Sequence, residues 1–220
     1  MNLDKEINKM LKLMHQEQST AKGSFGEKSV LKVCEGFYAT IGGILIHSYM
    51  YQPDNDLPGN IHYHDDTGSF TKDKLPSSGT EIDVLYVSPY RIFPIEVKAY
   101  KAKKITLTDD RILGCYKTDK SPVHQNEMHC RHLYSQILEA VPNGDTKYVV
   151  PIVCFTDEAE IYDERSEWQQ DYIKLSILDT LASVIAENNT PLEKRLNLEM
   201  VDRRLKSITV GSEMWLPVRH

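Results

Sequence analysis

The sequence predicts an α/β fold in which helices cover both faces of a mixed central sheet. Two observations predict it. The elements expected along the chain follow the order helix, strand, hairpin, helix, strand, helix. In addition, residues 149–155 form a near-continuous apolar run, which is typical of a strand covered on both faces.

The amino-terminal part is predicted to contain two helices and one strand. Apolar side chains recur at helical spacing over residues 3–18, and a polar run follows them. A second helix is expected to start near Phe25 and to end at the Gly42-Gly43 pair. Residues 44–51 are rich in branched and aromatic side chains, so they predict the first strand.

Residues 52–80 are expected to form a loop, because Pro, Gly, Asp, Asn and Ser dominate them. Such a length is unusual for a connection inside a compact domain, so the segment is either functional or partly mobile. Two interpretations stay open, a second metal site and a flap that faces a substrate. The side chains that are metal ligands by type are His62, His64, Asp65 and Asp66.

The second half of the chain is predicted to open with a hairpin and to continue mainly with helices. Ser121 and Pro122 have the residue types of an N-cap and a first helical position, so a helix should run from them to about Glu139. The expected elements are strands 82–87 and 92–99, the helix after Ser121, strand 149–155, helices 174–187 and 191–206, and a short strand 207–210.

The chain has 220 residues, which suits one medium domain with short appendages. We divide it into a helical extension (1–23), a main α/β domain (24–190), and a carboxy-terminal helix and short strand packed on that domain (191–220). The stripe of Met and Leu in the extension fits either core packing or a contact in a homodimer.

No apolar stretch is long enough to span a bilayer, and the first residues lack the apolar segment of a signal peptide. A cytoplasmic location without membrane contact is therefore expected. The four cysteines are widely spaced and form no CxxC pair, so they predict reduced thiols rather than a zinc site. They are Cys34, Cys115, Cys130 and Cys154.

The formal net charge is −6. A protein that coats or packages nucleic acid usually carries a positive charge, so the acidic balance argues against that class. It argues less against an enzyme, because bound cations neutralise the carboxylates of an active site.

Three charged residues stand out on the predicted hairpin because the strands around them are apolar. Residues two apart on a strand share a face, so Glu96 and Lys98 point the same way. If the turn is centred between Pro89 and Tyr90, partner numbers sum to 179 and Asp83 lies opposite Glu96. Two carboxylates about 5 Å apart repel unless a cation lies between them.

A divalent cation satisfies such a pair, and Mg²⁺ is commonly held by one or two carboxylates, water and substrate phosphate. A metal held by Asp83 and Glu96 would lower the pKa of a bound water beside a phosphate. Lys98 would stabilise the charge that develops on the phosphate and would help to orient or deprotonate the water. The alternative is an exposed polar face with a cross-strand ion pair, and the strand pattern alone leaves both open.

These residues resemble the signature of the PD-(D/E)XK, or restriction-endonuclease-like, nuclease superfamily, and more narrowly its nuclease-related domain (NERD) family. The resemblance covers about residues 24–187 in consistent order. Its elements are Gly26-Glu27 with Val30, Ile82-Asp83, Phe93 with Ile95-Glu96-Val97-Lys98, Ser121-Pro122-Val123-His124-Gln125, and Val150-Pro151-Ile152-Val153-Cys154-Phe155. The chain departs from the family pattern in its long 52–80 segment and in the residues that follow Lys98.

The resemblance implies a restriction-endonuclease-like fold, dependence on Mg²⁺ or Mn²⁺, and hydrolysis of phosphodiester bonds. It also carries a set of residues into the catalytic site, with the first three in the metal site: Asp83, Glu96, Glu27, Lys98 and Gln125. The expected function is therefore a metal-dependent DNA endonuclease. An RNA-cleaving enzyme and a catalytically silent binding module on the same fold are the alternatives.

Two further groups of polar side chains are considered as candidates. His129 and His132 share a helical face with Gln125, and we interpret both histidines as part of a polar face rather than as site residues. Lys101, Lys103 and Lys104 could contact a nucleic-acid backbone, which positions a duplex without reading its sequence. A solvated edge explains these lysines equally well.

Overall fold

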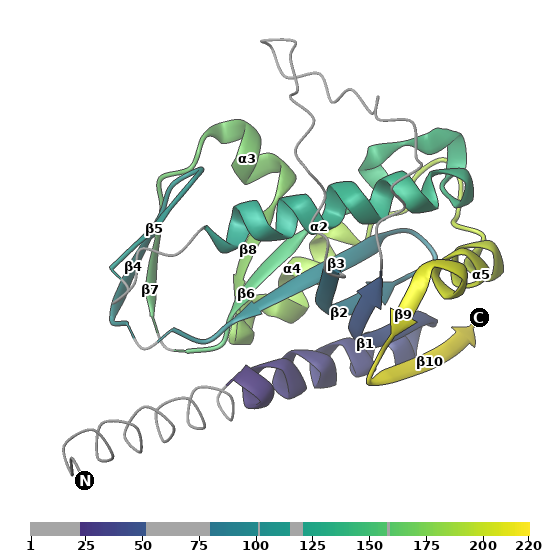
Figure 1. Cartoon of the computed structure of the whole chain (residues 1–220), viewed down its shortest axis with the longest axis horizontal. Helices are drawn as coiled ribbons and strands as arrows, with labels where there is room; N and C mark the ends of the chain where they lie inside the picture. The colour runs from purple at the N-terminus through teal and green to yellow at the C-terminus, as the bar shows by residue number, and fades with distance from the viewer. Residues whose placement is uncertain (1–22, 52–79, 101, 115–120, 158) are drawn as a thin grey trace, which may run out of the picture.

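The structure is a computed structural model that describes residues 23–51, 80–100, 102–114, 121–157 and 159–220. Its main sheet has seven strands, six of which lie in the order β10-β1-β2-β3-β6-β8, while β9 pairs with β1 (Figure 1). The bounds are β1 Gly43–Tyr51, β2 Thr80–Val87, β3 Ile92–Lys98, β6 Ile152–Phe155, β8 Lys174–Ile177, β9 Thr209–Gly211 and β10 Met214–Arg219.

The main sheet contains both kinds of strand pairing. β10, β1, β2 and β3 pair antiparallel, whereas β3, β6 and β8 pair parallel. β3 is therefore the strand at which the direction of pairing changes, and it has a neighbour on each side. The α/β class with a mixed sheet is confirmed.

Helices cover both faces of this sheet (Figure 1). One face packs on α2 (Pro122–Ile137) and α5 (Leu198–Ile208), and we call the buried apolar residues between them the α2/α5 core. The other face packs on the helix of residues 23–41 and on α4 (Leu181–Asn188), which enclose the 23–41/α4 core. Short 3-10 helices connect elements at Leu138–Ala140, Pro142–Gly144, Thr146–Tyr148 and Leu178–Thr180.

Local chemistry explains where the site-bearing elements begin and end. Ser121 caps α2, because its hydroxyl accepts a hydrogen bond from the backbone N–H of Val123, and Pro122 occupies the first turn. This confirms the predicted helix start. The helix 23–41 ends at Gly42, whose φ of 85° lies in the left-handed region that glycine adopts without strain.

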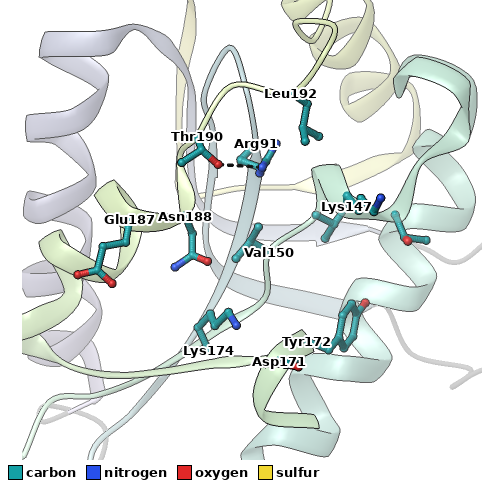
Figure 2. Close-up of a pocket in the computed structure, with 12 residues that line it drawn as sticks. Arg91, Lys147, Val150, Asp171, Tyr172, Lys174, Glu187, Asn188, Thr190 and Leu192 are labelled. Atoms are coloured by element: carbon teal, nitrogen blue, oxygen red, sulfur yellow. Dashed lines mark hydrogen bonds between the residues drawn. The ribbon is translucent and has the colours of Figure 1, made fainter. Parts of the chain in front are cut away.

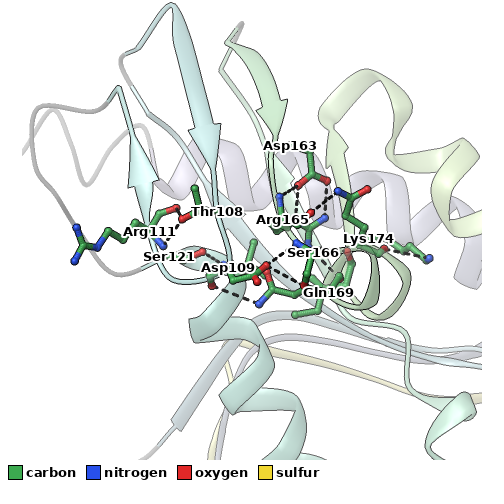
Figure 3. A network of polar contacts seen from close by, with 12 residues as sticks. Thr108, Asp109, Arg111, Ser121, Asp163, Arg165, Ser166, Gln169 and Lys174 are labelled. Carbon is green, nitrogen blue, oxygen red and sulfur yellow. Dashed lines mark hydrogen bonds and ion pairs between the residues drawn. The ribbon is translucent and has the colours of Figure 1, made fainter. Parts of the chain in front are cut away.

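A second, three-stranded sheet was missed by the sequence pattern. It has the order β5-β4-β7, with bounds β5 Ile112–Leu113, β4 Lys104–Leu107 and β7 Glu160–Asp163, and α3 (Glu167–Tyr172) follows it. Arg165 anchors this lobe, because its guanidinium donates to both carboxylate oxygens of Asp163 and to the carbonyls of Gln169 and Ile173 (Figure 3). The arginine is only 5% exposed, so these contacts compensate a buried charge.

Two other expectations were wrong in detail. Residues 174–177 form the edge strand β8 rather than the first turn of a helix, and α4 begins only at Leu181. The last long helix begins at Leu198 rather than at residue 191, because Asn197 is its N-cap and accepts a hydrogen bond from the N–H of Met200.

Several expectations fall outside the described residues, among them the 1–23 extension apart from Gly23, the ligand-type residues of the 52–80 segment, Lys101 and Cys115. The other three cysteines are buried free thiols. Within the described ranges, no helix is long and apolar enough to cross a membrane.

Candidate active site

The predicted hairpin register is confirmed over the four pairs that join β2 and β3. Val84 lies opposite Ile95 and Val87 opposite Ile92, so partner numbers sum to 179. The ladder ends there, and Asp83 and Glu96 come next in the same register. Beyond the last ladder pair, the side chain of Asp83 provides the hydrogen-bond acceptor: its Oδ2 accepts a hydrogen bond of 2.7 Å from the backbone N–H of Val97.

The neighbouring strand β1 is distorted at the same level. His47 pairs with Val84 and Tyr49 with Ile82, which puts Ser48 at the register position opposite Asp83. Ser48 has a φ of 50°, a left-handed conformation that costs a serine about 1–3 kcal/mol.

The distortion changes which face of the sheet the side chains occupy. Residues three apart on a regular strand face opposite sides of the sheet. Ile46 and Tyr49, on either side of Ser48, nevertheless both pack in the α2/α5 core. On β2, Ile82 and Leu85 show the same break in alternation on either side of Asp83. The regular alternation of side chains is therefore interrupted in both strands, at Ser48 in β1 and at Asp83 in β2.

Glu96 is the most buried charged group of the centre, with 1% of its side chain exposed. Its Oε1 accepts a hydrogen bond from Lys98 Nζ, and its Oε2 lies 3.5 Å from Nδ1 of His129 on α2. Burial disfavours the charged form, but the contact with His129 and the charge on Lys98 outweigh it and lower the pKa of Glu96. The centre thus holds Glu96 as a carboxylate.

Lys98 shares a face with Glu96, as predicted, whereas Val97 between them packs in the 23–41/α4 core. Burial disfavours the ammonium form, yet the charges of Glu96 and Asp83 attract it strongly enough to raise the pKa of Lys98. About a quarter of the side chain stays exposed (23%), so the ammonium group remains within reach of an incoming anion.

Asp83 differs from Glu96 in its electrostatic environment. Burial raises the pKa of Asp83 to about 8, and the negative charge on Glu96 acts in the same direction. The N–H of Val97 and the charge on Lys98 oppose this shift without cancelling it. The two carboxylates therefore share a region in which only one of them ionises easily near neutral pH.

Glu27 lies in the first turns of the helix 23–41 and is 30% exposed in its side chain. A Cβ on Gly26 would lie 2.7 Å from Oγ1 of Thr156, so the helix start packs closely against the residue that follows β6. Burial raises the pKa of Glu27, and the contact of its Oε2 with Nε2 of His47, 3.5 Å away, opposes that rise. The negative charge of Glu27 in turn contributes to the raised pKa of Asp83.

These residues fit a divalent cation in two respects. Oε2 of Glu96 is buried, and although Nδ1 of His129 lies 3.5 Å away, none of the described residues donates a hydrogen bond to it. The proximity of Asp83 and Glu96 also carries an electrostatic cost that a cation would remove. In the described part of the chain no three His, Cys, Asp or Glu side chains are arranged as a ready ligand set. Mg²⁺ needs no such set, because it retains water and takes substrate oxygens as ligands.

The other candidates have different positions. The side chain of Gln125 is exposed on α2, whereas His129, one turn later, reaches Glu96. Lys103 is exposed, and Lys104 Nζ lies 3.7 Å from Oε2 of Glu160 in the second sheet. Sequence reasoning assigned His129 to a polar face, although its i+4 spacing from Gln125 was the signal that could have placed it in the site.

A cleft of about 360 Å³ lies at the other end of the sheet, where β3 and β8 begin (Figure 2). Arg91, Lys147 and Lys174 line it together with the acidic Asp171 and Glu187. It shares no lining residue with the acidic centre, and its mixed charge favours no single class of ligand.

The α/β architecture, with a mixed sheet that carries Asp83 on β2 and the Glu96–Lys98 pair on β3, is that of a restriction-endonuclease-like fold. The family model described as the nuclease-related domain, NERD, matches residues 22–156, which is more than half of the chain. The chain therefore belongs to the NERD family and has a nuclease-related function. None of the curated proteins or solved structures compared with it matched.

Proposed function

We propose that this protein is a divalent-metal-dependent nuclease that hydrolyses phosphodiester bonds within DNA. The observation that carries the proposal is the meeting of Asp83, Glu96 and Lys98 at the end of the β2–β3 ladder. A nuclease of this type needs carboxylates that bind a metal ion and a positively charged side chain that faces the phosphate. Family membership supports the same reaction class.

Asp83 and Glu96 would hold Mg²⁺ or Mn²⁺, and Glu27 would contribute through a water molecule. When bound, the metal supplies Lewis-acid polarisation of the phosphate and lowers the pKa of a water ligand. Glu96 is suited to this task because Lys98 and His129 keep it ionised in a buried place. Asp83 is suited because its N–H bond from Val97 fixes the direction of its carboxylate.

Lys98 has the role of an electrostatic stabiliser. Its ammonium group is fixed by Glu96 before any substrate arrives, so little reorganisation is needed when charge develops on the phosphate. Its raised pKa keeps it protonated at neutral pH, which favours charge stabilisation over general-base action.

The net charge of −6 implies that the substrate is held by local rather than bulk electrostatics. Among the described residues, Lys103 and Lys104 are the predicted phosphate contacts and both are exposed, but Lys104 already lies 3.7 Å from the carboxylate of Glu160, so Lys103 is the better placed of the two. Such contacts position the backbone without reading its sequence, so cleavage with little sequence preference is expected.

A cleavage panel tests the proposal. Supercoiled, linear and single-stranded DNA, and RNA, are incubated with wild type in Mg²⁺, Mn²⁺ or EDTA. Nicking of supercoiled DNA is expected only with metal, and Asp83→Asn and Lys98→Ala should each reduce it by at least about a hundredfold. Lys206→Ala is the matched control, because Lys206 also pairs with a carboxylate, that of Asp202, on the surface of α5.

Each alternative has its own outcome in this panel. Cleavage of RNA alone would replace DNA by RNA as the substrate. Metal binding without cleavage of any nucleic acid would favour the binding module. Equal cleavage by wild type and both site variants would refute the proposed centre.

A further inference from the structure

His47 connects two carboxylates that come from distant parts of the chain. The imidazole is 6% exposed and lies on β1, next to the distorted residue Ser48. Its Nε2 is 3.5 Å from Oε2 of Glu27, and its Nδ1 is 3.1 Å from Oε2 of Glu213. Glu213 precedes β10 and lies beyond the part of the chain that matches the NERD family.

Glu27 needs a stabilising neighbour to stay near the centre. The carboxylates of Glu81 and Glu213 are its negative neighbours. The imidazole of His47, with Nε2 3.5 Å from Oε2 of Glu27, is the contact that offsets their repulsion. Without the imidazole, this repulsion would favour a Glu27 side chain that turns towards solvent, because the side chain is already 30% exposed.

The backbone fixes the position of Glu213 beside His47. The N–H of Glu213 donates a hydrogen bond of 3.0 Å to the carbonyl of His47, and Met214 pairs with His47 in the β1–β10 ladder. The carboxylate of Glu213 is 66% exposed, so this ion pair adds little to folding stability. Its effect is orientation, since a bond to one ring nitrogen fixes the direction of the other.

We propose that His47 is a positioning residue that holds Glu27 towards the metal centre, and that the link between β9 and β10 supplies Glu213 to orient His47. This arrangement is a chain of carboxylate, imidazole and carboxylate, and the outer-shell partners of metal ligands commonly work in this way. The inference rests on the proposed function, because it assigns Glu27 to the metal centre.

Mn²⁺ binding to the full chain, measured by calorimetry, tests the inference without an activity assay. His47→Leu should weaken Mn²⁺ binding about tenfold to a hundredfold, which is the usual effect of losing an outer-shell partner. His47→Gln, which retains a hydrogen-bond donor, should lose less. Glu213→Gln should weaken binding roughly threefold to tenfold and should leave folding unchanged, because its side chain is exposed.

Two controls separate positioning from general structural effects. Glu199→Gln removes another carboxylate–histidine pair, with His220, and should leave Mn²⁺ binding unchanged. In a Glu27→Gln background, His47→Leu and Glu213→Gln should have no further effect, because their influence passes through Glu27. A structural role would instead persist in that background.

The outcomes distinguish the inference from the proposed function. If wild type binds Mn²⁺ and Asp83→Asn does not, the centre stands, and unchanged binding by Glu213→Gln and His47→Leu overturns only the inference. Effects of His47→Leu that persist in the Glu27→Gln background overturn it as well. A wild type that binds no Mn²⁺ overturns the proposed function and the inference together.

Discussion

Replacing Asp83 with asparagine should stabilise the metal-free protein, and the gain should grow as the pH rises. Burial and the charge on Glu96 raise the pKa of Asp83 in the folded state from 3.8 to about 8. The folded state therefore binds a proton that the unfolded state has already released. For an acid whose pKa is raised by folding, its contribution to the free energy of unfolding is fully present below pH 4 and is lost as the pH rises to about 8.

The magnitude follows from the size of the shift. A rise from 3.8 to about 8 is roughly four pKa units, and each unit is worth about 1.4 kcal/mol. Ionisation of Asp83 in the folded state thus costs at most on the order of 5 kcal/mol of unfolding free energy above pH 8. Water that enters beside the charged carboxylate reduces this cost, so we expect a gain of a few kcal/mol for Asp83→Asn.

Urea denaturation in EDTA, at intervals from pH 4 to pH 9, measures this effect. Asparagine keeps an oxygen that can accept from Val97, so the difference in unfolding free energy between variant and wild type isolates the charge. That difference should be small at pH 4 and level off above pH 8. Asp179→Asn, in the 3-10 helix that precedes α4, serves as the control because Asp179 is exposed.

Mg²⁺ should restore much of the lost stability to wild type at pH 8 and little to Asp83→Asn. A difference that stays flat across the pH range would refute the argument. So would an asparagine variant that is less stable than wild type at pH 8.

Three further variants test other parts of the structure. Arg165→Met should cost about 2–4 kcal/mol in urea denaturation, because it removes the buried guanidinium that donates to the carboxylate of Asp163 and to the carbonyls of Gln169 and Ile173. A loss below about 0.5 kcal/mol would contradict the anchoring role. Gly43→Ala should destabilise the fold by several kcal/mol, because φ is 115° and a Cβ would overlap a carbonyl oxygen of β2; an unchanged melting temperature would argue against this geometry. Gly26→Ala should push the helix start away from the centre, because its Cβ would lie 2.7 Å from Oγ1 of Thr156, and should reduce metal-dependent cleavage about tenfold. Adding Thr156→Ala should restore part of the cleavage, and a double variant without any recovery would contradict this explanation.

The sequence predicted the centre best where it depends on neighbouring residues. The register of β2 and β3 follows from the short turn and from the alternation of apolar side chains, and both are local properties. The N-cap at Ser121 is also local. For the same reason Glu96 and Lys98 could be assigned to one face before any tertiary structure was considered.

The missed features depend on short segments or on distant contacts. β4, β5 and β7 have four, two and four residues, which is too short for a clear periodicity, and their pairing joins residues 104–113 to 160–163. Polar and apolar side chains alternate over residues 174–177, as in a strand. Helical residues follow at once, so the sequence pattern assigned the whole segment to one helix.

Site residues were missed for a similar reason. His129 reaches Glu96 only because α2 crosses the sheet at that level, and Glu213 reaches His47 only because β10 returns to β1. Neither crossing can be read from spacing along the chain.

The return of β10 to β1 also determines when the centre can be completed during synthesis. β1 spans residues 43–51, whereas β10 spans 214–219, so about 160 residues are made between the two strands of this ladder. Such distant pairing forms late, because the entropy of closing the chain is lost before the contact contributes any stability. A ribosome-bound chain without residues 213–219 can form β2 and β3, but it lacks the Glu213 contact of His47 and the pairing of β10 with β1. With the role proposed for Glu213, the acidic centre is therefore expected to be among the last regions of this protein to mature.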